Sequence, residues 1–475
     1  MPIDRNQTAT GETTGGEAAK NLTGQLLGLM QLRRAKAVRN QGTGANCRAA
    51  ALSANMFGGV AGNVLEWYDF AIFGFLAPLI GENFFPSDDP LVSLLGAFGV
   101  FAAAFLARPA GGLLFGYIGD RHGRKYALRL SVMLMAAPTF FVGLLPTHAS
   151  IGTLAPVLLV LLRLAQGLSV GGELIGSIAF VSENAPPGRR GFYSSWTFAS
   201  GYTGMMLGSL CAVLMNAALG HRAMAAWGWR LPFLTGVVIA LAAIWMRKGL
   251  TETPAFEDMR ACGRLNENPL ADAVRLFPGD VFHAALLVTL VGGGFYILFL
   301  WWPTFLDAFA GSGVPYAAAL NTFSLIVLIV LIPLAGRLSD QWGRKRLLAW
   351  SSAGLALLSW PLFLLATQGG FFPVFAAQMC FTVLMGFYLG PIPAALVEMF
   401  PANVRYSAIG LGYNLSLCFF GGTAPLLATW LVRRYQTVSS VALYLVFLSC
   451  LNLAAALALR ETKFIRVEDA LPATP

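Results

Sequence analysis

Two copies of one charged motif constrain this chain more than any other feature. The sequence GYIGDRHGRK at residues 116–125 returns as GRLSDQWGRK at residues 336–345, and long apolar stretches flank both copies. The pattern G-x-x-x-D-x-x-G-R-K is common to the two. A charged turn that recurs once in each half of an apolar chain predicts two similar membrane-embedded halves joined in tandem.

The composition also indicates a membrane protein. Hydrophobic residues make up 56% of the chain and charged residues 12%, with a mean hydropathy of +0.65, whereas soluble proteins contain about 25% charged residues. An apolar run of about 20 residues can span a bilayer as a helix, which satisfies its own backbone hydrogen bonds. Twelve such runs begin near Leu52, Leu91, Tyr126, Thr153, Phe192, Arg230, Val281, Ala317, Leu347, Phe371, Tyr406 and Val438. We therefore predict an all-α integral membrane protein with twelve transmembrane helices in two six-helix halves.

The basic residues predict how these helices cross the membrane. Of the 32 Lys and Arg residues, 26 lie in the tails and in the loops on one side of the predicted helices, and basic loops favour the cytoplasm. Both termini are therefore expected to be cytoplasmic. We expect a flexible cytoplasmic tail at residues 1–48, six-helix halves at 49–249 and 280–460, a cytoplasmic loop between them at 250–279, and a short cytoplasmic tail at 461–475.

The sequence disfavours several other classes of protein. The net charge of +9 follows from the predicted topology and does not indicate nucleic-acid binding. The first 48 residues lack the apolar core of a cleavable signal peptide, and the chain has no G-x-x-x-x-G-K-[ST] motif of an ATP-driven pump. The six cysteines have neither metal-ligand nor disulfide spacing. We expect no metal, no cofactor and no enzymatic activity, and we expect the chain to function as a monomer.

Two further patterns repeat at the same ends of the two halves. The pattern E-x-x-P-x-x-x-R occurs at residues 183–190 and 398–405, and a weaker echo relates residues 247–253 to 460–462. A carboxylate at a helix end can form a charge-assisted latch with an Arg of a neighbouring loop, and glycines let two helices approach closely. We interpret these repeats as a cytoplasmic gate; the alternative is that the arginines only follow the positive-inside bias. The expected gating residues are Gly116, Asp120, Gly123, Arg124, Glu183, Arg190, Gly336, Asp340, Gly343, Arg344, Glu398 and Arg405.

Five charged residues fall inside predicted helices of the first half. They are Glu66, Asp69, Arg108, Arg163 and Glu173. A charge at the bilayer centre costs at least about 2.5 kcal/mol, so a mutually paired cluster that faces a central cavity is expected. A carboxylate near an Arg can alternate between protonated and ion-paired forms as its surroundings change. Glu66 or Asp69 is therefore expected to couple transport to protons, with Glu173 as a further candidate; the alternative is a static ion-pair network between helices.

Arginines in such a cavity are natural anchors for a carboxylate substrate. Arg108 and Arg163 are the candidates, and Gln166 lies one helical turn from Arg163. The polar groups of Tyr, Trp and Asn side chains from the second half could line the rest of the cavity, although aromatic and Asn side chains also pack helix interfaces. The second-half candidates are Tyr296, Trp301, Asn321 and Asn414.

The motifs also resemble those of a known family. Besides the duplicated loop, the relevant stretches are GNVLEWYDF (62–70), FLARPAGGLLFG (105–116), RLAQGLSVGGE (163–173), WGWRLPF (227–233), ETPAF (252–256) and MFPANVRYSAIG (399–410). Together they resemble the metabolite–proton symporter branch of the major facilitator superfamily, which includes α-ketoglutarate, citrate, shikimate and proline or betaine permeases. The resemblance implies a bacterial inner-membrane protein that works by alternating access coupled to proton entry.

The cargo is less constrained than the class. Two arginines in the cavity favour a small organic anion, and GRRGFYSSW (188–196) is similar to the α-ketoglutarate and citrate permeases. A proton symporter that imports a di- or tricarboxylate is therefore the first expectation. The alternatives are a proton symporter of a zwitterionic osmolyte such as proline or betaine, and a drug or metabolite exporter of the same superfamily.

Overall fold

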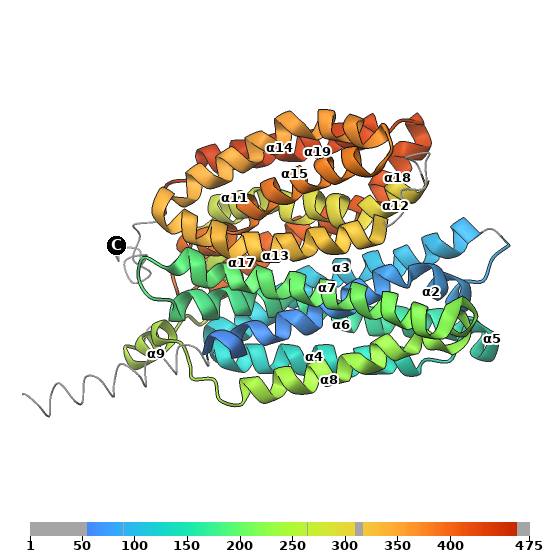
Figure 1. Cartoon of the computed structure of the whole chain (residues 1–475). Coiled ribbons are helices and arrows are strands. Elements are labelled where there is room, and N and C mark those ends of the chain that lie inside the picture. Colours follow the sequence, from blue (N-terminus) through green and yellow to red (C-terminus); the bar gives the residue numbers. More distant parts are fainter. Residues whose placement is uncertain (1–54, 89, 264, 309–316, 463–475) are drawn as a thin grey trace, which may run out of the picture. The chain divides into compact units, whose positions relative to one another are not determined.

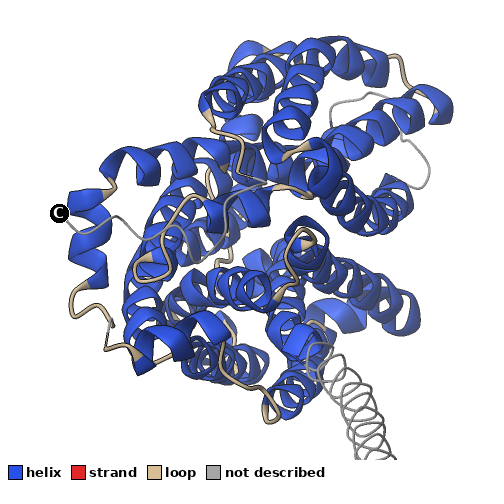
Figure 2. Ribbon diagram, turned by 90° about the vertical axis from the view of Figure 1, so that its left-hand side faces the viewer, coloured by secondary structure: helices blue, strands red, loops and turns tan. Residues whose placement is uncertain are grey.

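The computed structural model describes residues 55–88, 90–263, 265–308 and 317–462, and within these ranges all regular elements are helices (Figure 2). The tail expected at residues 1–48, and all but the first two residues of the tail expected at 461–475, lie outside the described residues. The first half contains the helix over Asn55–Phe75, α2 (Ala77–Phe84), α3 (Pro90–Arg121), α4 (Arg124–Leu144), α5 (His148–Ile151), α6 (Leu154–Asn184), α7 (Arg190–Ala223), η1 (Met224–Gly228) and α8 (Arg230–Arg247). Two short helices, α9 (Pro254–Ala261) and α10 (Pro269–Leu276), follow in the expected inter-half loop.

The second half begins at Pro278. It contains α11 (Pro278–Leu287), η2 (Leu290–Gly294), η3 (Tyr296–Trp301), α12 (Trp302–Ala308), α13 (Ala317–Trp342), α14 (Arg344–Thr367), α15 (Phe371–Leu389), α16 (Ile392–Glu398), α17 (Arg405–Ser416), η4 (Leu417–Gly421), α18 (Ala424–Tyr435) and α19 (Ser439–Ala458). Several spans are therefore built from consecutive helical pieces.

The predicted number of spans agrees with the structure. Among the described residues, 11 helices are long and apolar enough to cross a membrane, or 12 if the bent pair Asn55–Phe75 and Ala77–Phe84 counts as one span. The two members of that pair meet at an angle of 66°. Pro78, in the first turn of α2, explains the bend, because proline lacks a backbone N–H and its ring clashes with the preceding turn.

The two halves contact each other mainly through two helix pairs, α3 with α17 and α7 with α13 (Figure 1). Glycines permit both approaches. A Cβ on Gly116 of α3 would meet the backbone of Ser407, and a Cβ on Gly336 of α13 would meet the backbone of Gly191. Figure 2 looks along the bundle from the end that carries α9 and Thr462, which we call the motif end because both copies of the repeated motif lie there.

The repeated motif requires glycine at its turn for conformational reasons. Gly123 (φ 114°, ψ 148°) and Gly343 (φ 103°, ψ 155°) precede α4 and α14 in a backbone region that is essentially restricted to glycine. A side chain at either position would also collide with an acidic side chain, Glu252 or Glu461.

We predict that Gly123→Ala and Gly343→Ala each destabilise the protein, since backbone strain of this kind costs about 1–3 kcal/mol. Thermal unfolding in detergent measures the effect. Gly279→Ala is the matched control, because Gly279 has a helical conformation and no atom within 4 Å of the added Cβ. Equal midpoints for Gly343→Ala and Gly279→Ala would contradict the prediction.

Candidate functional site

Two aspartates connect the halves at the motif end. The Asp120 carboxylate accepts hydrogen bonds from the backbone N–H of Ser407 (2.9 Å) and Tyr406 (3.3 Å) and from the Ser407 hydroxyl (2.8 Å). The Asp340 carboxylate accepts from the backbone N–H of Gly191 (2.8 Å) and Phe192 (2.9 Å). Each aspartate thus caps the first turn of a helix in the other half, where unpaired N–H groups and the helix dipole favour an anion.

The motif arginines hold these aspartates in place. Arg124 lies 2.7 Å from Asp120 and Arg344 lies 2.9 Å from Asp340, each one turn further along its own half. The same guanidinium groups reach the glutamates of the second repeated pattern, at 3.5 Å for Arg124–Glu183 and 3.2 Å for Arg344–Glu398. All four pairs have little or no solvent exposure.

The weak third echo in the sequence belongs to the same structure. Glu252 accepts from the backbone N–H of Arg124 (3.1 Å), and Glu461 accepts from that of Arg344 (2.9 Å), so each caps the helix that follows a motif. The next residue of each echo, Thr253 or Thr462, donates to the pattern glutamate of its half at 2.6 Å. Burial raises the pKa of Glu252 above its ordinary range, while the capping hydrogen bonds act in the opposite direction.

The geometry of these contacts differs from the simple acid–arginine latch suggested by the sequence. Most arginine–carboxylate pairs lie within one half, because the turn at the motif glycine brings the Asp at the end of one helix next to the Arg that begins the following helix. The halves are instead joined by aspartates on backbone N–H groups, by the ion pair of Arg405 with Glu183 (2.9 Å), and by Arg124 donating to the Ala402 carbonyl (2.8 Å). Arg190, the counterpart of Arg405, interacts electrostatically with Glu398.

We predict that Asp340→Asn opens the motif end. The change removes the negative charge that the backbone N–H groups of Gly191 and Phe192 contact. A hydrogen bond to a charged group contributes about 1.5–3 kcal/mol to stability. In a background without native cysteines, a cysteine at buried Ser195, beside Gly336, reports opening. Thiol alkylation at this position is expected to rise about tenfold.

The control for this experiment is Asp280→Asn, which removes an exposed carboxylate outside the gate. It is expected to leave the alkylation rate unchanged. An unchanged rate in Asp340→Asn as well would show that the aspartate does not keep the halves together.

The charges inside the first half form three separate pairs. Asp69 lies 2.5 Å from Arg163 and accepts a hydrogen bond from Gln166 (2.9 Å). The Arg163 guanidinium also lies over the rings of Phe70 and Phe73, 4.9 and 4.0 Å from their centroids. These hydrogen bonds and ring contacts all involve first-half residues, so Arg163 and Gln166 pack in the interior of that half.

The second pair joins Glu173 to Arg247, with a further hydrogen bond from Ser131 to Glu173. Arg247 was expected at the end of the sixth helix but was not counted among the charges inside the first half. Arg247 is buried at the end of α8, where its guanidinium also donates to the Gly58 and Leu128 carbonyls. The interior charges of the first half are therefore three carboxylates and three arginines.

The third pair lies where the halves meet and is looser. Arg108 Nη2 and Glu66 Oε1 are 3.8 Å apart, and both side chains are buried. Arg108 Nε donates to the Asn414 side chain of α17 (3.3 Å), and Asn414 in turn donates to the Gly171 carbonyl (2.7 Å). Neither Arg108 Nη2 nor Glu66 Oε2 has a hydrogen-bond partner among the described residues.

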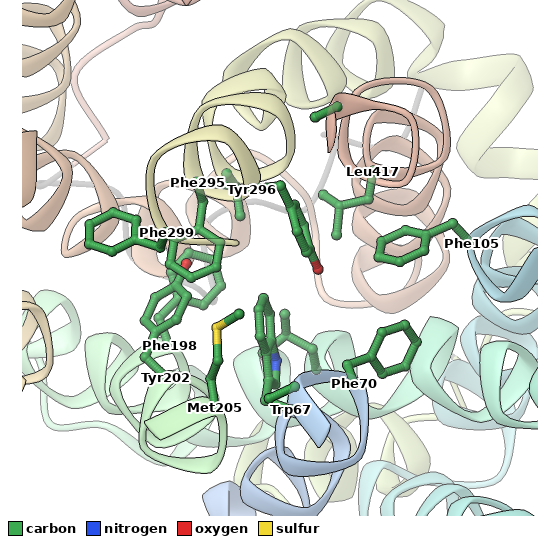
Figure 3. Packing of buried hydrophobic residues seen from close by; sticks show 14 of the residues in the cluster. Trp67, Phe70, Phe105, Phe198, Tyr202, Met205, Phe295, Tyr296, Phe299 and Leu417 are labelled. Atoms are coloured by element: carbon green, nitrogen blue, oxygen red, sulfur yellow. The ribbon is translucent and has the colours of Figure 1, made fainter. Parts of the chain in front are cut away.

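Aromatic rings from both halves surround this pair. Trp67 and Tyr296 lie face to face, with an interplanar angle of 15° and centroids 6.4 Å apart, and Tyr202 and Phe295 have centroids 4.4 Å apart. Figure 3 shows Trp67 and Tyr296 pointing toward each other from opposite halves. Tyr413, which interacts electrostatically with Arg108 and Glu66, completes the group. We call these residues the central site: Glu66, Trp67, Arg108, Tyr202, Phe295, Tyr296, Tyr413 and Asn414.

Several polar atoms at this site have no hydrogen-bond partner among the described residues, as have others elsewhere in the fold, among them Arg163 Nε and Nη2. Besides Arg108 Nη2 and Glu66 Oε2, the Trp67 Nε1 and the hydroxyls of Tyr202 and Tyr413 are buried without a hydrogen-bond partner among the described residues. Buried polar groups in proteins are almost always satisfied. The central site can therefore offer both hydrogen-bond donors and ring faces to a small polar molecule.

The structure brings together some of the expected site residues and separates others. Glu66, Arg108, Tyr296 and Asn414 meet at the central site. Trp301 instead donates to Thr429 (3.0 Å), and Asn321 donates to the Phe299 carbonyl (2.9 Å), so both lie within the second half. The sequence analysis missed the aromatic residues Trp67, Tyr202, Phe295 and Tyr413. Only Trp67 carried a signal, as the neighbour of Glu66.

We predict that the Asp69 and Glu66 carboxylates differ in their effect on stability. Asp69→Asn strands the buried Arg163 charge, which typically costs about 3–5 kcal/mol. Glu66→Gln also leaves a buried arginine, but the pair that it removes is 3.8 Å apart without a hydrogen bond, so its effect is expected to be smaller. Thermal unfolding of the two variants in detergent tests this, and equal losses would contradict the distinction.

The fold consists of two halves of membrane-spanning helices that meet at the motif end and at the central site. The family model described as Major Facilitator Superfamily matches residues 59–425. The chain is 33% identical over 424 residues to the glycine betaine/proline/ectoine/pipecolic acid transporter OusA of Dickeya dadantii, covering 87% of this chain and 84% of that protein. It is 32% identical over 421 residues to the proline/betaine transporters of Salmonella typhimurium and Escherichia coli K12, with the same coverage.

Solved structures share the fold at lower identity. The structure of the proton:xylose symporter XylE bound to 6-bromo-6-deoxy-D-glucose matches with a TM-score of 0.75 and 19% identity, over 89% of this chain and 99% of that one. The chain belongs to the Major Facilitator Superfamily. The expectations of this superfamily, of an all-α membrane fold and of a transporter rather than an enzyme are thereby confirmed.

Proposed function

We propose that this protein is a proton-coupled symporter that imports a zwitterionic osmolyte of the betaine or proline type across the bacterial inner membrane. This was the alternative reading of the sequence. The first reading, a di- or tricarboxylate, has no support among the relatives, three of which are named for proline and betaine.

The observation that carries the proposal is the charge balance of the central site. Arg108 and Glu66 contribute one positive and one negative charge, while Arg163 and Arg247 are each paired with a carboxylate in the first half. A zwitterion adds no net charge to this arrangement. A di- or tricarboxylate would bring two or three negative charges to a single loosely paired arginine, and uncompensated buried charge is costly.

The remaining groups suit the two ends of such a substrate. Arg108 Nη2 is buried without a hydrogen-bond partner, and a guanidinium binds carboxylate in a two-pronged geometry. A quaternary or secondary ammonium group is attracted to the faces of Trp and Tyr rings, which Trp67 and Tyr296 offer from opposite halves. The substrate would thus contact both halves at once, as alternating access requires.

Glu66 is the proposed proton-carrying group. It lies beside Arg108 with one carboxylate oxygen free of hydrogen bonds. When Glu66 is protonated, Arg108 is released to bind the substrate carboxylate; when the substrate leaves, Arg108 again favours the ionised glutamate. Asp69 and Glu173 have close arginine partners in the first half and are proposed to stabilise structure.

The gate at the motif end is proposed to close the cytoplasmic side. The positive-inside bias supports a cytoplasmic location of this end, and the contacts of Asp120 and Asp340 across the interface support its role in closing that side. Import then requires these contacts to break after substrate and proton have bound. Gly116, Arg190, Glu398 and the other repeated residues are proposed to act in the same gate.

We predict that proteoliposomes containing the protein accumulate labelled betaine or proline when an inward proton gradient is imposed. Labelled α-ketoglutarate and citrate are expected to show no accumulation above empty vesicles, because the site lacks the positive charge to hold them. Accumulation of either acid without betaine or proline would overturn the proposal and restore the organic-anion reading.

Substitutions in the same assay test the central site. Trp67→Ala is expected to raise the apparent KM for betaine about 2- to 30-fold, as the loss of about 0.5–2 kcal/mol of cation–π interaction implies. Trp245→Ala is the control, because Trp245 is 73% exposed on α8 away from the site. Equal effects of the two changes would rule out a role for the Trp67 ring in substrate binding.

A further inference from the structure

A groove on the outer side of the second half is not used by the proposed transport cycle. It measures about 500 Å³ and lies among α13, α14 and α15. Apolar and aromatic side chains line most of it: Leu338, Trp342, Leu347, Trp350, Leu384 and Phe387. A second hollow of about 500 Å³ continues from it around Trp342, Arg346 and Trp350 toward Lys345 and Glu461.

The groove has an apolar part and a cationic mouth. Trp342 is 57% and Trp350 78% exposed, and Arg346 is also exposed while Lys345 is half-buried. Neither basic side chain forms a hydrogen bond or ion pair within the described residues, in contrast to their neighbour Arg344. The one carboxylate at the mouth, Glu461, is engaged with the backbone N–H of Arg344.

The depth of these residues matches the surface of a bilayer. α13 ends at Trp342 and α14 begins at Arg344, so Arg346 and Trp350 lie roughly 3 and 9 Å along α14 at 1.5 Å per residue. Trp side chains favour the headgroup level of membranes, and basic pockets between transmembrane helices bind anionic headgroups. A phospholipid is the molecule that has a charged group at this depth and an apolar chain below it.

The first half provides an internal comparison. In the aligned motif copies, Trp342, Arg346 and Trp350 correspond to His122, Tyr126 and Leu130. The combination of two exposed tryptophans with a free arginine is therefore specific to the second half and is not required by the duplicated gate. Arg129 of the first half is instead used within the fold, where it donates to the Arg247 carbonyl.

We propose that this groove binds an anionic phospholipid. The phosphate lies between Arg346 and Lys345, and an acyl chain follows the apolar wall past Trp350 toward Phe387. The proposal does not depend on which solute the central site transports.

Native mass spectrometry of the full-length protein, titrated with phosphatidylglycerol or phosphatidylcholine, tests this site. The wild type is expected to bind one phosphatidylglycerol more tightly than phosphatidylcholine. Removing one cation near a membrane surface weakens such binding by about 1 kcal/mol, or roughly fivefold. Arg346→Tyr, which introduces the residue found at the aligned position of the first half, is expected to show this loss, and Trp350→Leu is expected to weaken both lipids.

Arg260→Ala is the matched control, because Arg260 is an exposed cation on α9 outside the groove. It is expected to bind phosphatidylglycerol like the wild type. Equal affinity of the wild type for the two lipids, or an Arg346→Tyr variant that retains the full preference, would overturn the proposal. Displacement of the bound lipid by inorganic phosphate alone would also overturn it, since the apolar groove would then contribute nothing.

Discussion

The structure depends on carboxylates that cap helices belonging to the opposite half. Asp120 and Asp340 each accept hydrogen bonds from the first N–H groups of a helix across the interface, where the helix dipole strengthens the attraction. The motif arginines fix the carboxylates, and Glu252 and Glu461 cap the helices that carry those arginines. Because every acceptor lies at a helix end, the two halves can separate there without unwinding any helix, which is the property that a gate needs.

A second constraint is that charge inside the membrane must be balanced. In the first half, Glu66, Asp69 and Glu173 are paired with Arg108, Arg163 and Arg247, but the three pairs differ in the distance between the charged groups. The Asp69 and Glu173 pairs are close and join helices of the first half, so we expect them to hold these helices together throughout a transport cycle. The Arg108 pair is loose, and Arg108 also contacts Asn414 of the second half. The need to balance buried charge thus assigns the close Asp69 and Glu173 pairs to structure. It leaves the looser Glu66–Arg108 pair as the one proposed to exchange a proton and bind a zwitterion.

The sequence predicted the features that repetition and hydropathy encode. The membrane spans followed from apolar runs, and the motifs that return in each half contain Asp120 and Asp340, which contact the opposite half. The role of Arg247 could not be foreseen, because a basic residue at a helix end looks like any loop cation until its helix is packed against Glu173. Trp67 and Tyr202 gave little signal among many aromatic residues, since only the approach of the two halves brings them together. The first expectation for the cargo lost its support for a related reason: Arg163 appeared available in the sequence, whereas packing gives it Asp69 and two rings.

The central claim is that one loosely paired carboxylate, Glu66, carries the proton while the site around it binds a neutral zwitterion. Betaine counterflow and proton-driven betaine accumulation, measured side by side in proteoliposomes of the Glu66→Gln variant, test it most directly. The account predicts that exchange of labelled for unlabelled betaine persists, because the binding groups remain, while accumulation driven by the proton gradient is lost. Undiminished accumulation in this variant would contradict the account and move the proton site elsewhere.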